Sequence, residues 1–196
     1  MPRDAHIGKG AATQQRILAA AVARFADDGF RQTSVAQVAR DAGVTAPAVH
    51  AYFRSKTELF HAAFERDIAG LLEVIKARLS EGPIPGGGFA LIPALLAELD
   101  AHPLARRIFQ GREAEHTREL LNLPAVVHTR AQLTAMVAGA QQAGLLRADL
   151  QPEALAGAME TIVLALLLGA VQVGMIGDEN RRLAILAILT TGIRAP

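Results

Sequence analysis

Apolar residues recur with helical spacing along most of this 196-residue chain. Over residues 13–28, the i, i+3, i+4, i+7 pattern of one helix face is formed by Leu18, Ala21, Val22 and Phe25. The same spacing returns over two short segments and then down a long one that begins near residue 56. No stretch alternates with period two for long enough to predict a strand. The pattern predicts an all-α protein of about nine helices.

Three helices separated by short turns are predicted in the first quarter of the chain. Gly29 ends the first helix, where glycine favours the left-handed conformation. Ser34 followed by Gln37 is a capping box, which starts a second helix over 35–42. Gly43 then supplies the turn to a third helix. Two short helices joined by such a turn, and braced by a preceding helix, are typical of a helix-turn-helix unit.

The third helix, residues 46–53, is the one that enters the DNA major groove in such a unit. Thr45 caps it, and Pro47 fits its first turn because amides there have no intrahelical acceptor. Val49 and Phe53 form its inward pair. Outward side chains can contact thymine methyl groups, base edges or phosphates. The candidate DNA-contacting residues are Ser34, Thr45, Ala46, Pro47, His50, Tyr52 and Lys56.

Charge is unevenly distributed along the chain. Residues 1–56 hold eight Lys/Arg and four Asp/Glu, a net +4, and residues 57–196 hold twelve and fifteen, a net −3, which together give the +1 of the whole chain. A basic first quarter favours a polyanionic partner for this part. Arg3 and Lys9 lie in a predicted flexible arm, residues 1–12, and are candidates for further phosphate or minor-groove contacts.

Two motifs in this region resemble the DNA-binding domain of the TetR family of bacterial transcriptional regulators: SVAQVARDAGVT at 34–45 and YFRSKTEL at 52–59. The resemblance implies an all-α homodimer that binds operator DNA and is commonly released by a small ligand in its C-terminal domain. It also implies phosphate contacts by Ser34, Tyr52 and Lys56. Pro47 and His50 depart from the family, which often has Gly and usually Tyr there, so no operator sequence is carried over.

A proline- and glycine-rich stretch, EGPIPGGG at 81–88, is the clearest linker. Beyond it a break is expected at His102–Pro103 and a turn region at 144–151. The helices predicted in this part cover residues 89–101, 104–121, 124–143, 152–176 and 179–193. The domains expected are the arm, a helix-turn-helix domain over 13–56, and a helical effector-binding and dimerisation domain over 57–196.

The last two helices are apolar on nearly all sides. Residues 161–177 carry no charge, and a helix without a polar face must be buried all round. A membrane span is the competing interpretation, but it needs about 20 apolar residues, and this run is shorter and contains three glycines. We therefore expect a homodimer through a four-helix bundle. Its predicted contacts are Ile162, Leu166, Ala170, Val173, Leu183, Leu186, Leu189 and Ile193.

An effector pocket is expected among the helices between residues 64 and 160. Ordinary core packing or surface exposure is the alternative for each candidate. The candidate lining residues are Phe64, Ile68, Phe89, His102, Phe109, His128, Gln132, Met136 and Met159. Their character favours a hydrophobic or amphipathic effector.

Signals for other classes of protein are weak. The absence of cysteine excludes disulfides and thiol catalysis, and the polar N-terminus has no signal-peptide core, so a cytoplasmic, nucleoid-associated protein is expected. Glu113 and His116 form a single Glu-x-x-His, whereas di-iron bundles need two. We predict no enzyme, metal or cofactor.

The function favoured by the sequence is a ligand-responsive DNA-binding repressor, with an unknown small molecule as effector and no membrane partner. The alternative is a dimeric DNA-binding regulator with no small-molecule effector, controlled by a protein partner or by its own abundance. A third class, an all-α enzyme, would need a catalytic set that the sequence does not show.

Overall fold

The computed structural model describes residues 3–80, 91–174 and 178–194, except the side chains of 3–9, 79–80, 179, 182 and 186. Within these residues the chain is all-α, as predicted, and contains no β-strand. Its helices are α1 (Arg3–Gln32), α2 (Val35–Asp41), α3 (Ala46–His50), α4 (Lys56–Ser80), α5 (Leu91–Glu98), the 3-10 helix η2 (Leu99–Ala101), α6 (Pro103–Phe109), α7 (Thr117–Leu120), α8 (Pro124–Gln142), α9 (Pro152–Val173) and α10 (Glu179–Ile193).

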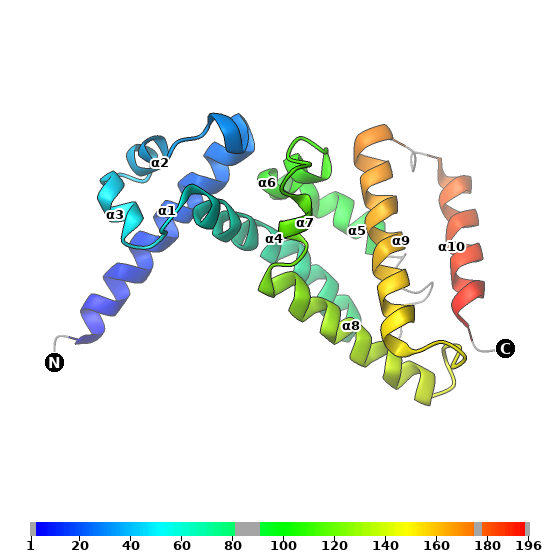
Figure 1. The fold of residues 1–196 in the computed structure, drawn as a ribbon. Helices are drawn as coiled ribbons and strands as arrows, with labels where there is room; N and C mark the ends of the chain where they lie inside the picture. Colours follow the sequence, from blue (N-terminus) through cyan, green and yellow to red (C-terminus); the bar gives the residue numbers. More distant parts are fainter. Residues whose placement is uncertain (1–2, 81–90, 175–177, 195–196) are drawn as a thin grey trace.

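The helices form a head and a larger body (Figure 1). The head contains α1, α2 and α3 at the N-terminal end, and the body contains α5 to α10. Helix α4 begins beside α1 in the head and continues into the body, where it packs against α5, α6 and α8. The long fourth helix is therefore the covalent and packing link between the two parts.

One apolar core runs through both parts of the molecule. It joins buried side chains of the head, among them Phe25, Val38 and Val49, to Phe60 of α4 and Leu167 of α9. A smaller cluster between α8 and α9 consists of Val137, Leu155, Ala156 and Met159. The main core crosses the predicted boundary at residue 56, because α4 contributes apolar side chains to both sides of it.

Several predicted helix boundaries differ from the structure. Helix α1 begins at Arg3 rather than at residue 13, and α3 ends at His50 rather than at 53. The expected single helix over 104–121 is wrong: the chain forms α6, a run of turns and the short α7. Gly111 adopts a φ of 75° after α6, a conformation that interrupts helical hydrogen bonding. The division explains why ten α-helices are found in the described residues rather than about nine.

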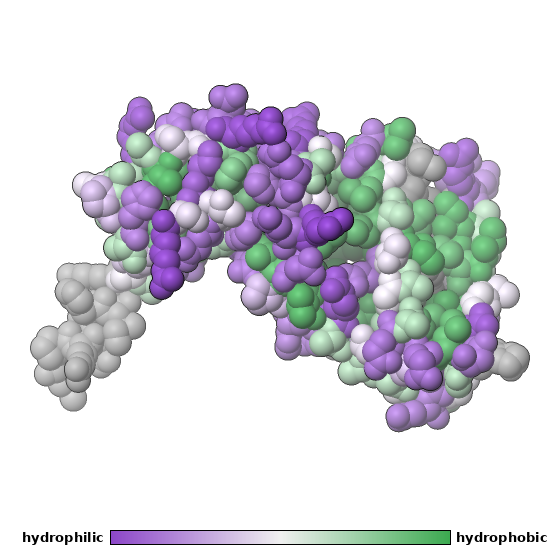
Figure 2. All heavy atoms as spheres, viewed as in Figure 1, coloured by the Kyte–Doolittle hydropathy of each residue, from purple (hydrophilic) through white to green (hydrophobic). Residues whose placement is uncertain are grey.

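Helices α9 and α10 present the most apolar surface of the body (Figure 2). By length and composition α9 could cross a membrane, since its most apolar window has a mean hydropathy of 2.1, yet only 22% of that window is buried within one chain. One side of α9 packs on the main core through Leu167 and its neighbours Val163, Leu164, Leu168 and Val171. The other side of α9 is not packed against the described helices to a comparable extent.

Candidate DNA-binding and effector sites

The turn between α2 and α3 is built by local capping. The Ser34 hydroxyl accepts a hydrogen bond from the Gln37 amide at 3.3 Å, and the Gln37 side chain accepts one from the Ser34 amide at 2.7 Å. These bonds confirm the predicted capping box, which satisfies amides at the start of α2. Gly43 follows α2 with a φ of 67°, and the Thr45 hydroxyl accepts from the Ala48 amide at 3.3 Å. This geometry fixes the angle between α2 and α3.

Helix α3 is anchored on one side and open on the other. Val49 and Phe53 are buried in the main core, as predicted. Thr45, Pro47 and His50 are exposed on the surface, whereas Ala46 is half-buried. The short helix therefore presents its first turn and His50 outward, in the arrangement that base contacts in a major groove require.

Tyr52 and Lys56 make contacts within the protein that the sequence analysis did not predict. The Tyr52 side chain is half-buried, and its hydroxyl lies near Gly10 of α1, 3.7 Å from where a Cβ would stand. The Lys56 ammonium donates to the carbonyl oxygens of Thr33 at 3.0 Å and Arg31 at 3.5 Å. It also stands 4.4 Å from the ring centre of Phe30, a cation–π distance. An ammonium has three N–H donors, so one remains for a phosphate oxygen.

Arg54 is a candidate that the sequence analysis did not name. It is exposed in the turn between α3 and α4, and its backbone amide donates to the Glu58 carboxylate at 2.8 Å. That bond fixes the turn while leaving the guanidinium outside the core. The position of Arg54 inside the YFRSK motif, next to two candidate phosphate contacts, was the signal available in the sequence.

The predicted pocket residues lie in different parts of the body. Phe64, Ile68 and Phe109 are buried in the main core, and Met159 belongs to the smaller cluster. Met136 and His102 are half-buried, whereas His128 and Gln132 are exposed on α8, where their nitrogen atoms lie 3.1 Å apart. Phe89 lies outside the described residues. The effector pocket remains a prediction.

The described residues line several surface hollows, and the three considered next contain no predicted pocket residue. One hollow of about 870 Å³ lies between the α8–α9 turn and the end of α10, beside Arg147 and Gly192. Another of about 540 Å³ lies between the end of α1 and the α6–α7 turns. The third, about 480 Å³, lies on the head between α1 and α2.

Asp67 and His102 connect α4 to the start of α6. The Asp67 carboxylate is buried and accepts from the Ala105 amide at 2.7 Å, so it caps the first turn of α6. Burial raises the pKa of Asp67, although the Ala105 N–H opposes the shift. The His102 imidazole lies 3.8 Å from Asp67, and a side chain at Gly70 would collide with it.

Most of the predicted dimer contacts lie away from the main core. Ile162, Leu166 and Ala170 are half-buried, and Val173 is 70% exposed at the end of α9. On α10, Leu183 is 58% exposed. Leu189 is half-buried, and Ile193 packs on the smaller cluster. The Leu186 side chain lies outside the described residues.

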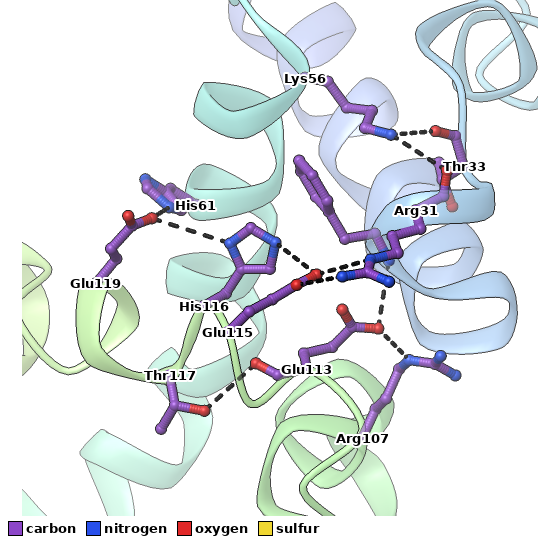
Figure 3. A network of polar contacts seen from close by, with 11 residues as sticks. Arg31, Thr33, Lys56, His61, Arg107, Glu113, Glu115, His116, Thr117 and Glu119 are labelled. Atoms are coloured by element: carbon purple, nitrogen blue, oxygen red, sulfur yellow. Dashed lines mark hydrogen bonds and ion pairs between the residues drawn. The ribbon is translucent and has the colours of Figure 1, made fainter.

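A polar network joins the head to the body where α1 meets the α6–α7 turns (Figure 3). Arg31 donates twice to Glu115, at 2.6 and 3.1 Å, and this pairing lowers the pKa of Glu115. Arg107 donates to the buried Glu113 at 2.7 Å, and Glu113 also accepts from the Phe30 amide at 3.3 Å. These carboxylates therefore hold the end of α1.

The sequence analysis missed this network because its partners come from distant segments. Glu113 and Glu115 belong to a segment that was predicted to be helical, where they would have faced different directions. Only the cluster of charges at 112–119 gave a signal.

Comparisons with known proteins show what this chain is similar to. Residues 17–63 match the model of the tetR family of bacterial regulatory proteins. No curated protein sequence matches the chain significantly. A tetR-family transcription regulator from Shewanella sp. PV-4 has a similar fold, with a TM-score of 0.69, 23% identity, and coverage of 94% of this chain and 99% of its own.

Two further solved structures are similar along nearly their whole length. A transcriptional regulator from Streptomyces coelicolor is 26% identical, covering 94% of this chain and 99% of its own, with a TM-score of 0.61. FadR from Bacillus subtilis is 19% identical, covering 92% and 99%, with a TM-score of 0.66. The family model confirms the resemblance predicted from the motifs over residues 17–63, the region that contains the helix-turn-helix, and the solved structures show the same fold along nearly the whole chain.

Proposed function

We propose that this chain, which shares the DNA-binding domain and the fold of the TetR family, is a ligand-responsive repressor that acts on operator DNA as a homodimer. The observation that carries the proposal is α3: a capped helix with Val49 and Phe53 in the core and Pro47 and His50 on the surface. Such a helix is rigidly held and open to a major groove.

The proposed phosphate contacts surround this helix. Ser34 precedes this helix and Tyr52 follows it, with Arg54 in the turn before α4 and Lys56 at the start of α4. Phosphate contacts set the register of a protein on DNA without reading the sequence. Base discrimination is then assigned to Pro47 and His50, the two positions at which the motif departs from its family.

Signal transfer is proposed to run through α4. This helix begins beside the recognition helix and continues through the body, where Asp67 binds the start of α6. A ligand shifts such an equilibrium only if it binds the released state more tightly than the DNA-bound state. FadR from Bacillus subtilis was solved with stearoyl-CoA, which supports a hydrophobic or amphipathic effector class for this chain.

Dimerisation is proposed through α9 and α10. The apolar side of α9 that turns away from the core, ending at Val173, would be covered by the same surface of a second copy. A two-fold pairing of this kind is self-complementary. It would place two recognition helices on half-sites about one helical turn apart, roughly 34–36 Å.

The direct test is selection of DNA fragments by the purified protein from its own genome. We expect enrichment of a small set of fragments with two-fold symmetric sites. His50→Ala should change the selected sequence, whereas His128→Ala, which removes another exposed histidine far from the head, should leave it unchanged. Identical selection by wild type and His50→Ala, or no selection at all, would refute the proposed reading face.

A regulator without a small-molecule effector is the second candidate. It is favoured by the packing of Phe64, Ile68 and Phe109 in the main core. Thermal unfolding with and without long-chain acyl-CoA separates the two, because a ligand that binds only the folded state raises its stability by RT ln(1 + [L]/Kd). A shift that also releases DNA supports the first candidate.

A further inference from the structure

Gly29 interrupts α1 near its end, with a φ of 80° and a ψ of 172° that are not helical. In a regular helix the Phe30 amide would donate to the Ala26 carbonyl, four residues back. Here the Phe30 amide donates to the Glu113 carboxylate at 3.3 Å. The Ala26 carbonyl accepts from Arg107 Nη1 at 3.2 Å. Two side chains of the body therefore bond to the two backbone groups that a continuous helix would pair with each other.

These two side chains also bind each other (Figure 3). Arg107 Nε, on α6, donates to Glu113 Oε1 at 2.7 Å, and the same oxygen accepts from the Phe30 amide. The Arg107 and Glu113 side chains are only 16% and 5% exposed. Breaking a buried ion pair leaves an uncompensated charge, so the pair holds its partners firmly. One helical hydrogen bond of α1 is thus replaced by a chain of bonds that runs through the body.

The same segment of the body also holds the residues that follow the interruption. Glu115 accepts twice from Arg31. The His116 ring lies 4.3 Å from the Phe30 ring, measured between their centres. Two residues then separate Arg31 from Ser34, the N-cap of α2. The body therefore holds the residues that lead directly into the helix-turn-helix.

This contact is a second link between head and body. The first link is α4, which is continuous through both parts. Contacts between domains decide how far the domains move relative to one another. A head joined through one helix can rock about it, whereas a second attachment, through α6, restricts that motion. In a dimer, the orientation of each head sets the separation of the two α3 helices.

We propose that the Arg107–Glu113 pair positions the head, and thereby determines which spacing between two DNA half-sites the homodimer accepts. This inference rests on the proposed function, because it assigns a role in operator recognition to residues outside the reading face. A second head that is held in register with its half-site increases affinity by about 10²–10⁴-fold. A looser head is spread over more positions, so affinity decreases at the preferred spacing and varies less among other spacings.

Two variants loosen the pair in different ways. Arg107→Met combined with Glu113→Gln removes both charges together, so that neither remains buried without a partner. Arg107→Lys keeps the charge balance but loses the fork of donors that joins Glu113 to the Ala26 carbonyl. Arg106→Met is the matched control, since Arg106 is the neighbouring residue on α6 and pairs with the exposed Asp100.

The first test measures the position of the head in the absence of DNA. The chain contains no cysteine, so Ala36→Cys on α2 and Ala131→Cys on α8 provide two exposed sites for spin labels. Labelled chains are diluted with unlabelled protein, and pulsed electron paramagnetic resonance then reports the distance within one chain. Both variants of the pair should broaden the distance distribution, and the control should keep the width of the wild type.

The second test measures affinity for DNA with one half-site and with two half-sites at a series of spacings. Both variants should bind a single half-site as the wild type does, because α3 is unchanged. At the preferred spacing they should lose at least about tenfold in affinity, a part of the gain from simultaneous binding. They should also discriminate less among spacings. A purely structural role of the pair would lower all affinities alike and leave this profile unchanged.

Two results overturn the inference. One is a distance distribution of wild-type width in the variants that fold, and the other is an unchanged dependence on spacing in those variants. A wild type that selects no DNA contradicts the proposed function and removes the role in spacing with it. Unchanged variants of a wild type that does select DNA contradict only the inference about Arg107 and Glu113.

Discussion

Lys56 has an intramolecular role in the free protein that the motif did not predict. Its ammonium ties the start of α4 to the carbonyl oxygens that follow α1 and stands over Phe30. The side chain is half-buried, so it is held in place before DNA arrives. A preorganised cation loses less conformational freedom when a phosphate binds. The structural and the proposed DNA-binding roles are therefore compatible.

Lys56→Ala should weaken DNA binding to all sequences alike, because a phosphate contact carries no base information. The slope of log K against log salt should fall by about one, the value for one lost phosphate contact. Fluorescence anisotropy over a salt series measures both quantities. Lys76→Ala is the control, since Lys76 pairs with Glu73 in the body. An unchanged salt slope in Lys56→Ala would remove this residue from the DNA contacts.

Asp67 makes stability depend on pH with a sign opposite to that of a typical surface carboxylate. Burial raises its folded-state pKa above the ordinary 3.8. The folded protein therefore binds this proton more tightly than the unfolded chain, so the contribution of Asp67 to stability decreases as pH rises from 3.8 through the raised value. Asparagine keeps an oxygen to accept the Ala105 N–H but cannot ionise.

Asp67→Asn should accordingly gain stability relative to wild type as pH rises from about 4 to 7. Urea unfolding at a series of pH values measures the difference. Asp100→Asn, at an exposed carboxylate paired with Arg106, provides the comparison. Asp67→Ala should be less stable than either, by about 1 kcal/mol, because the Ala105 amide loses its acceptor. A constant difference between Asp67→Asn and wild type across the series would contradict the assignment.

At the scale of elements, local signals predicted most of the head correctly. The capping box at Ser34, the turn at Gly43 and the cap at Thr45 depend on neighbours in sequence, so they could be recognised without the fold. The segment after α6 could not, because its turns are held by contacts with α1 and α9. Gln172 of α9, for example, donates to the Phe109 carbonyl beside Gly111.

Gly29, near the end of α1 in the head, packs directly against residues of the body. Its φ of 80° produces a kink near the end of α1, and a side chain there would collide with the Arg107 guanidinium and the Glu113 carboxylate. Gly29→Ala should lower the free energy of unfolding by at least about 1–2 kcal/mol, the cost of a positive φ in a residue with a Cβ. Movement of the ion pair would add to this cost.

Gly139→Ala is the matched control for Gly29→Ala. Gly139 lies within α8, and a Cβ there would meet nothing within 4 Å. This substitution should raise stability by about 0.5–1 kcal/mol, because alanine loses less backbone entropy in a helix. Chemical denaturation of both variants gives the comparison. Equal effects of the two substitutions would show that Gly29 has no special role.

At the scale of the molecule, the sequence predicted the fold class and the order of the domains. It did not predict the contacts that join helices distant in sequence. Helical periodicity and motif spacing gave an all-α chain with an N-terminal helix-turn-helix, and the comparisons confirm both. These contacts between helices depend on residue pairs that are distant in sequence, such as Asp67 with Ala105 and Glu115 with Arg31. Single residues of that kind have no periodicity, so composition and spacing could not pair them.

The exposed apolar side of α9 and α10 leads us to predict that two chains pair through it. Apolar side chains such as Val173 and Leu183 are largely exposed in one chain. An obligate interface over both helices would bury more than about 2,000 Å². We expect the wild type to have the mass of two chains by light scattering. Val173→Arg should produce monomers, because the charge would be buried without a partner.

Val127→Arg provides the control for Val173→Arg, since Val127 is an exposed apolar residue on α8, outside the proposed interface. This variant should remain a dimer and keep its DNA affinity. Val173→Arg should instead bind a two-half-site operator much more weakly, because each monomer then binds a half-site independently. A monomeric wild type that still binds DNA, or a dimeric Val173→Arg, would show that the chains do not pair through the end of α9.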